Sequence, residues 1–114
     1  MINLARLVSE KHTEQGLKQQ VIAALRAIYD PELPVNIYDL GLIYALDIDD
    51  TGHVELHMTL TAPGCPVAQS FPAQVEQTVA AVEGVTSAHV EIVWEPPWEQ
   101  SRMTEAARLQ LGLV

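Results

Sequence analysis

Residues 42 to 61 read LIYALDIDDTGHVELHMTLT, and this stretch decides the fold that the sequence predicts. Apolar residues occupy every second position on both sides of the central DDTG. Such alternation is typical of two strands that each bury one face. Asp, Thr and Gly at the centre are turn-forming residues. The stretch therefore predicts a β-hairpin.

The alternation also predicts which side chains face the core. The inner residues of the two strands are Leu42, Tyr44, Leu46 and Ile48, then Val54, Leu56, Met58 and Leu60. The other face of the second strand carries His53, Glu55, His57, Thr59 and Thr61. We expect the histidines to lie on an open, solvent-facing side of the sheet, and His89 to join them from a third strand.

A helix is predicted before the hairpin. Leu17, Val21, Leu25 and Ile28 recur at steps of three and four residues, which gives a helix one apolar face. Thr13 is the expected N-cap. The helix should end at Asp30, because a residue that precedes proline is disfavoured in helical conformation.

A second helix and a third strand follow the hairpin. Residues 65–85 carry an apolar stripe at Val75, Val79 and Val82, and we expect the helix to end at Gly84. Pro72 predicts a kink, or a helix that begins only after it. Residues 88–94 predict a strand with Val90, Ile92 and Trp94 inward.

Prolines at positions 96 and 97 interrupt the chain, and residues 101–112 predict a short last helix with Ser101 near its cap. The predicted order is α-β-β-α-β-α. We expect an α/β (α+β) fold, a compact two-layer sandwich whose small sheet has helices on one face. Residues 1–12 are interpreted as an N-terminal extension, and residues 13–114 as one domain.

Charge and composition exclude several function classes. The 114 residues include 15 acidic and 6 basic side chains, for a net charge of -9. The basic residues stand singly, so we expect no nucleic-acid partner. No apolar run is long enough to predict a membrane span. A single cysteine forms no intrachain disulfide, which fits a reducing compartment, and we expect a cytoplasmic protein.

Cys65 is the only cysteine, and it lies in the loop TAPGCP between the second strand and the second helix. With Pro66 in the first helical turn, the helix N-terminus would favour the thiolate, which binds metals and attacks electrophiles. Packing of Cys65 as a small buried residue is the alternative. A nucleophilic role would also require a histidine base, and no catalytic signature surrounds any histidine.

Three carboxylates form a second candidate site. Asp30, Glu32 and Asp39 lie in the proline-containing loop DPELPVNIYDLG. Carboxylates in such a loop bind a hard cation or accept hydrogen bonds from backbone N–H groups. We expect this loop to lie against the Cys65 loop, with a carboxylate within about 8 Å of the sulfur.

Three separated motifs, IYDPELPVNIYDLGLIY, MTLTAPGCP and WEPPWEQSRMTEAARLQLG, resemble the small iron–sulfur cluster assembly domain family. The likeness is to its SufT-like members, which are related to PaaD and to the eukaryotic cytosolic cluster-targeting homologue. The family's characteristic residues fall on Asp30, Pro31, Glu32, Asp39, Gly41, Thr59, Thr61, Gly64, Cys65 and Pro66.

The resemblance implies a non-enzymatic accessory factor in the assembly of iron–sulfur clusters or their transfer to apoproteins, as in SUF-type maturation. Cys65 would be a transient ligand of iron or of a cluster, with Thr59, Thr61 and Gly64 around the thiol. Asp30, Glu32 and Asp39 would be further metal ligands. The implied partners are assembly scaffold proteins and client apoproteins.

One cysteine limits how a cluster can be held. Iron–sulfur clusters usually take four cysteine ligands, so we expect none to be stably bound in a monomer. The cluster could be shared between the chains of a homodimer, or Cys65 could exchange ligands with a partner. Two further alternatives are a subunit adaptor of a larger metalloenzyme, in which Cys65 is structural, and an enzyme with Cys65 as nucleophile.

Overall fold

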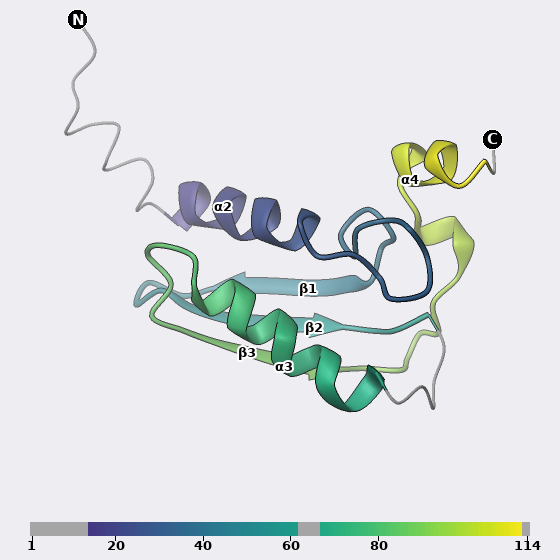
Figure 1. The fold of residues 1–114 in the computed structure, drawn as a ribbon. Coiled ribbons are helices and arrows are strands. Elements are labelled where there is room, and N and C mark those ends of the chain that lie inside the picture. Colours follow the sequence, from purple (N-terminus) through teal and green to yellow (C-terminus); the bar gives the residue numbers. More distant parts are fainter. Residues whose placement is uncertain (1–13, 62–66, 113–114) are drawn as a thin grey trace, which may run out of the picture.

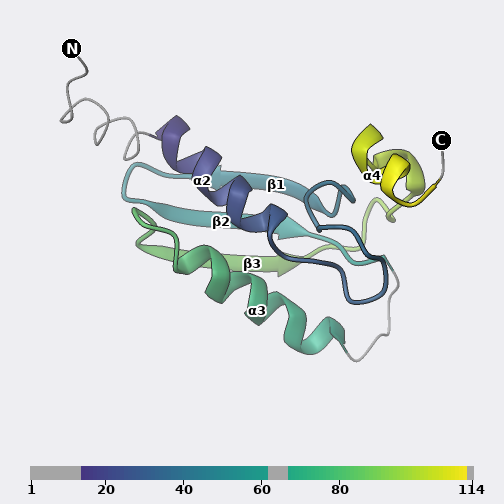
Figure 2. The ribbon, with the colours of Figure 1, turned by 45° about the horizontal axis from the view of Figure 1, so that its top comes forward.

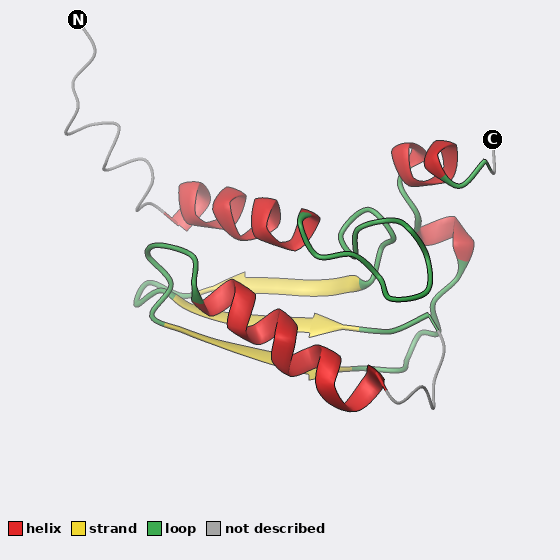
Figure 3. Ribbon diagram, in the orientation of Figure 1, coloured by secondary structure: helices red, strands yellow, loops and turns green. Residues whose placement is uncertain are grey.

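The computed structural model of the protein describes residues 14–61 and 67–112. Their elements, in chain order, are α2 (Glu14–Arg26), β1 (Ile43–Ile48), β2 (His53–Met58), α3 (Val67–Ala80), β3 (Ser87–Ile92), the 3-10 helix η1 (Gln100–Arg102) and α4 (Glu105–Gln110). Figure 3 distinguishes the helices from the strands. The predicted order and the α+β class are confirmed. The predicted extension, residues 1–12, lies outside the described residues.

The three strands form one mixed sheet in the order β1-β2-β3. Strand β2 pairs antiparallel with β1 and parallel with β3. Figures 1 and 2 show α2 and α3 over the same face of this sheet, while α4 lies beyond its end. The predicted two-layer sandwich is therefore confirmed. In the described part of the chain, no helix has the length and apolarity that a membrane crossing requires.

The core lies between the sheet and the two long helices. Its buried residues include Leu17, Val21, Leu25, Leu42, Ile48, Val54, Leu56, Met58, Phe71, Val75, Val79 and Val90. Ile92 packs against them from the end of β3. The apolar residues that the helical and strand periods select thus pack into one core, as the sequence predicted. Phe71 was not predicted, although it lies four residues before Val75 on the same stripe, because Pro72 suggested a helix that begins after it.

The predicted inner position of Tyr44 is wrong. The register between β1 and β2 shifts between Ile43 and Ala45, because Ile43 pairs with Met58 and Ala45 pairs with His57. One extra residue in β1 offsets the pairing, so that Ile43 rather than Tyr44 lies opposite the buried Met58, whereas Leu46 still lies opposite Leu56. Ile43 therefore packs against the core, whereas Tyr44 places its ring under the guanidinium of Arg102, 4.6 Å away.

Trp94 is also not inward, and its side chain is 42% exposed. Strand β3 ends at Ile92. The amide of the next residue, Val93, still donates to the carbonyl oxygen of Met58. After that residue the chain leaves the sheet toward Pro96, so the alternation of buried side chains stops.

Both long helices have boundaries that differ from the predicted ones. Helix α2 ends at Arg26, because residues 28–30 pair instead with residues 35–37 around the bridge between Tyr29 and Asn36. Helix α3 contains Pro72 and begins five residues before it, so a start after Pro72 is wrong. This helix ends at Ala80 rather than at the predicted Gly84. Thr13 lies outside the described residues.

The cap of the last helix is Thr104, not Ser101. The hydroxyl of Thr104 accepts a hydrogen bond from the amide of Ala107, and its backbone is extended. Ser101 instead belongs to η1, the separate turn that precedes α4. Both are good capping residues, and the backbone conformation decides between them.

Candidate functional site: a pocket lined by three sequence motifs

An open pocket of about 430 Å³ has lining residues that follow β2 and β3 in the sequence, among them Thr61 and Trp98. Three separated segments contribute its lining residues, which are Glu32 and Leu33, then Thr61, then Trp98, Gln100, Met103 and Leu111. These segments correspond to the three motifs that carried the family resemblance. Thr61 is four residues before Cys65 in the sequence.

The first pocket segment is shaped by Asp30. Its Oδ2 accepts hydrogen bonds from the amides of Glu32 and Leu33, at 2.9 and 2.8 Å. Asp30 is 8% exposed, and its own amide donates to the carbonyl oxygen of Val35. These hydrogen bonds fix the conformation of the loop and thereby hold Glu32 and Leu33 at the pocket wall.

Asp39 makes contacts with three other parts of the described chain. Its Oδ2 accepts a hydrogen bond from the side-chain amide of Asn36 at 2.9 Å, and its Oδ1 lies 3.7 Å from Nε of Arg26. Its carbonyl oxygen accepts from the amide of Thr104. These contacts join the loop to α2 and to the start of α4. Asp39 itself is not among the residues that line the pocket.

The third pocket segment crosses back over the loop that precedes β1. Nε1 of Trp98 donates to the carbonyl oxygen of Leu40 at 2.8 Å. Next to this bond, Gly41 has a φ of 80°, and a Cβ placed on it would lie 2.3 Å from the carbonyl oxygen of Arg102. Glycine is needed for both reasons, the left-handed conformation and the close approach.

Thr59 and Thr61 behave differently although both were predicted to lie near the thiol. Thr61 is half-buried and lines the pocket. Thr59 is 1% exposed, and its Oγ1 has no hydrogen-bond partner among residues 14–61 and 67–112. A buried hydroxyl without a partner is uncommon, because losing its water costs free energy.

Gly64 and Cys65 lie outside the described residues. The predicted distances between the thiol and the carboxylates therefore stay predictions. The structure brings Glu32 and Thr61 to one pocket, but it leaves Asp30 and Asp39 to local contacts. Within residues 14–61 and 67–112, no three His, Cys, Asp or Glu side chains are placed to hold a metal ion.

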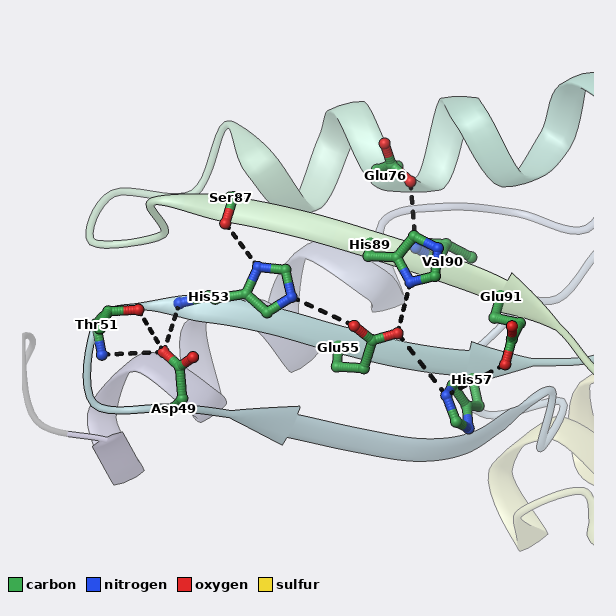
Figure 4. Close-up of polar contacts among 10 residues, drawn as sticks. All are labelled: Asp49, Thr51, His53, Glu55, His57, Glu76, Ser87, His89, Val90 and Glu91. Atoms are coloured by element: carbon green, nitrogen blue, oxygen red, sulfur yellow. Dashed lines mark hydrogen bonds and ion pairs between the residues drawn. The ribbon is translucent and has the colours of Figure 1, made fainter.

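The histidines in the described part of the chain do not line the pocket. His53, His57 and His89 lie together on the outer face of the sheet, as expected (Figure 4). They surround the carboxylate of Glu55. His12 lies outside the described residues.

Sequence reasoning missed the apolar wall of the pocket. Trp98, Met103 and Leu111 were seen as part of a motif, but nothing in their spacing predicted a common cavity with Leu33. The signal lay in the run WEPPWEQ, which keeps two tryptophans beside prolines outside any helix or strand. Such a run favours a surface loop with a packing or binding role.

The comparisons with known proteins identify the family. Residues 18–92 match the family model described as "Iron-sulfur cluster assembly protein". This protein belongs to that family, as the motifs predicted. The solved structure of a domain of unknown function from Bacillus anthracis is similar, with a TM-score of 0.80, 34% identity, and coverage of 89% of this chain and 96% of that one.

Two relatives have names that describe a role. A protein from Porphyromonas gingivalis named "Fe-S protein maturation auxiliary factor" is 43% identical over 97 residues, which cover 85% of this chain and 92% of that protein. The "Fe-S protein maturation auxiliary factor YitW" of Bacillus subtilis is 40% identical over 100 residues, covering 88% and 98%. Both similarities extend over nearly the whole of each relative.

Proposed function

We propose that this protein is an accessory factor in the maturation of iron–sulfur proteins and that it is not itself an enzyme. The family and the names of the relatives support this role. The observation that carries it is the shared pocket of Glu32, Thr61 and Trp98, because it brings residues of the three motifs together and Thr61 is four residues before Cys65 in the sequence. The protein would act in the cytoplasm, where a free thiol stays reduced.

In this proposal Cys65 is a transient ligand of iron or of a cluster that passes through the protein as cargo. A single thiolate leaves most coordination positions of a cluster to other thiols. An incomplete ligand set favours release, since the receiving protein can supply the missing cysteines. Scaffold proteins and client apoproteins, or a second copy of this chain, would provide the remaining ligands. Gly64 would let the loop backbone approach the cargo closely.

The pocket would hold a partner protein while the cargo is exchanged. Leu33, Trp98 and Met103 give it an apolar wall, and burying apolar surface there would stabilise a complex. Its volume of about 430 Å³ suits one or two large side chains of a partner. Among the three predicted metal-binding carboxylates, we assign only Glu32 to the cargo side of the pocket.

The pocket also favours a second candidate, a subunit adaptor in which Cys65 is structural. The pocket is built from residues other than Cys65 and would bind a partner without it. The two candidates differ in what the thiol does. They therefore predict different results for a variant that loses only the thiol.

Anaerobic reconstitution with ferrous iron and sulfide tests the proposal. Wild type and Cys65→Ser are compared by visible absorbance and by bound iron and sulfide per chain, after excess reagents are removed. We expect wild type to bind iron and sulfide and the variant to bind at least fivefold less. Equal loading of the two proteins would show that Cys65 is not a ligand and would favour the adaptor.

Matched variants separate the pocket from the thiol. Glu32→Gln removes a carboxylate at the pocket, and Glu105→Gln removes one from the exposed first turn of α4. We expect reduced loading only in Glu32→Gln. Leu33→Asp should load normally but transfer more slowly to an apo-ferredoxin used as a probe client. Normal transfer by Leu33→Asp would contradict the partner-binding role of the pocket.

A further inference from the structure

Glu55 lies at the centre of the sheet face that α2 and α3 leave uncovered (Figure 4). It is opposite Asp47 of β1 and opposite His89 of β3. His53 and His57 flank it on β2, two residues away on either side. Side chains at this spacing share one face of a strand. Three imidazoles therefore surround one carboxylate.

Contacts between these side chains link the strands. Glu55 Oε2 lies 2.5 Å from Nδ1 of His89 on β3, and Glu55 Oε1 lies 3.3 Å from Nε2 of His53. Two neighbouring pairs of opposite residues also make contacts between β2 and β3. Nδ1 of His53 lies 2.6 Å from Oγ of Ser87, and Nε2 of His57 lies 3.6 Å from Glu91. Each of these three pairs of opposite residues thus makes one histidine-containing contact between β2 and β3.

Contacts of this kind help to hold strand β3 in the sheet. This strand lies at the edge of the sheet and pairs with β2 alone. On its other side, the amide of Val90 donates to Oε2 of Glu76 from α3 at 3.2 Å, which occupies a backbone group that an edge strand would otherwise expose. The inner face of β3 packs against the core. Its outer face carries the histidine-containing contacts to β2.

The charge of this face depends on the imidazoles. None of the three strands contains a lysine or arginine. The groups that surround the cluster are the carboxylates of Asp47 on β1, Asp49 in the hairpin turn, Glu91 on β3 and Glu76 on α3. Protonated histidines are thus the source of positive charge within the three strands. A carboxylate between protonated imidazoles attracts them, and between neutral ones it can only accept hydrogen bonds.

We propose that Glu55 and its three imidazoles form a proton-dependent clamp that fastens β3 to β2 on the uncovered face of the sheet. The clamp is complete when Glu55 is ionised and His89 is protonated. Strand β2 leads to Thr61 and β3 leads to Trp98, which are two walls of the pocket. The clamp would therefore fix the spacing of those walls, whatever the pocket binds.

The contact between Glu55 and His89 shifts the pKa of each residue in the direction that this proposal requires. The hydrogen bond to Glu55 raises the pKa of His89 above its ordinary value of 6.5. The hydrogen bonds from His89 and His53 lower the pKa of Glu55 below 4.5. The His89 contribution is complete below pH 6.5 and is lost as the pH rises through the folded-state pKa. The Glu55 contribution is present above pH 4.5 and is lost as the pH falls, so the clamp is strongest between these values.

A double-mutant cycle of Glu55→Gln and His89→Gln tests the clamp in the metal-free full-length protein. Urea unfolding is measured for the four proteins at pH 5.5 and at pH 8.5. We expect the two residues to be coupled at pH 5.5, by about a two- to fivefold factor in the unfolding equilibrium constant, and more weakly coupled at pH 8.5, where a neutral imidazole can only donate a hydrogen bond. Equal coupling at both pH values, or none at pH 5.5, would overturn the proposal.

NMR titration of the imidazoles provides a test that needs no destabilised variant. In wild type, we expect His89 to titrate at a higher pH in the native protein than in the same protein unfolded in urea. The Glu55→Gln variant should bring the native value down, while Glu105→Gln should leave it unchanged. A native His89 that titrates as in the unfolded chain would overturn the clamp.

Discussion

The indole of Trp98 and the carbonyl of Leu40, which are 58 residues apart in the sequence, are joined by a hydrogen bond of 2.8 Å. This bond fastens the segment after β3 to the loop before β1. It also turns the ring of Trp98 toward the pocket that Leu33 and Thr61 complete. The bond thus joins two segments that are distant in the sequence.

Trp98→Phe should lower the free energy of unfolding by about 1 kcal/mol, because the ring stays and the carbonyl of Leu40 loses its donor. Urea unfolding measures the loss. Trp94→Phe is the matched control, since Trp94 is 42% exposed and its indole makes no such bond to the described residues. The same loss in both variants would show that the hydrogen bond contributes nothing.

Gly41→Ala should destabilise the protein by about 3 kcal/mol, from left-handed strain together with a clash against the backbone of Arg102. Gly112→Ala is the control. Gly112 has a similar φ of 74° but no atom within 4 Å of an added Cβ, so only the strain of about 1 kcal/mol applies. Equal thermal unfolding of the two variants would contradict the close approach at Gly41.

Asp30→Ala should cost about 2 kcal/mol, because the amides of Glu32 and Leu33 lose a charged acceptor in a buried position. Asp30→Asn keeps an oxygen there and should cost about half as much. Asp47→Ala removes an exposed carboxylate that faces Glu55 and should be close to neutral. Chemical unfolding of the three variants checks this order.

Thr59→Val should leave stability unchanged or raise it by about 1 kcal/mol, because valine fills the same space without an unpaired hydroxyl. Thr59→Ser keeps the hydroxyl and loses a buried methyl group, so it should cost about 1 kcal/mol. If Thr59→Val were the less stable variant, the hydroxyl would have a partner in the folded protein.

Acidification should weaken the hairpin turn through Asp49. The hydroxyl of Thr51 and the amide of His53 donate to its carboxylate, and these bonds lower the pKa of Asp49 below 3.8. This stabilisation is present above pH 3.8 and is lost as the pH falls through the lowered pKa. The melting temperature of wild type minus that of Asp49→Asn should therefore shrink toward pH 2. A constant difference would contradict this origin.

Local periodicity determined the larger part of the fold. Alternating residues around DDTG predicted the hairpin, and Leu25 and Val75 lie on helix faces whose three- and four-residue spacing predicted their burial. The three separated motifs also predicted the family. These features could be read in advance because strand and helix periods depend only on neighbours along the chain. The predicted roles of Cys65 remain predictions.

Tertiary structure alone decided the features that depend on register and on distant partners. The shift in β1 that turns Tyr44 out of the core becomes visible only when β1 pairs with β2. Only the folded chain brings Leu33, Thr61 and Trp98 around one pocket. Only the parallel pairing of β2 with β3 brings His89 to Glu55. Contacts between residues far apart in sequence are fixed by the packing of whole elements, which no local pattern encodes.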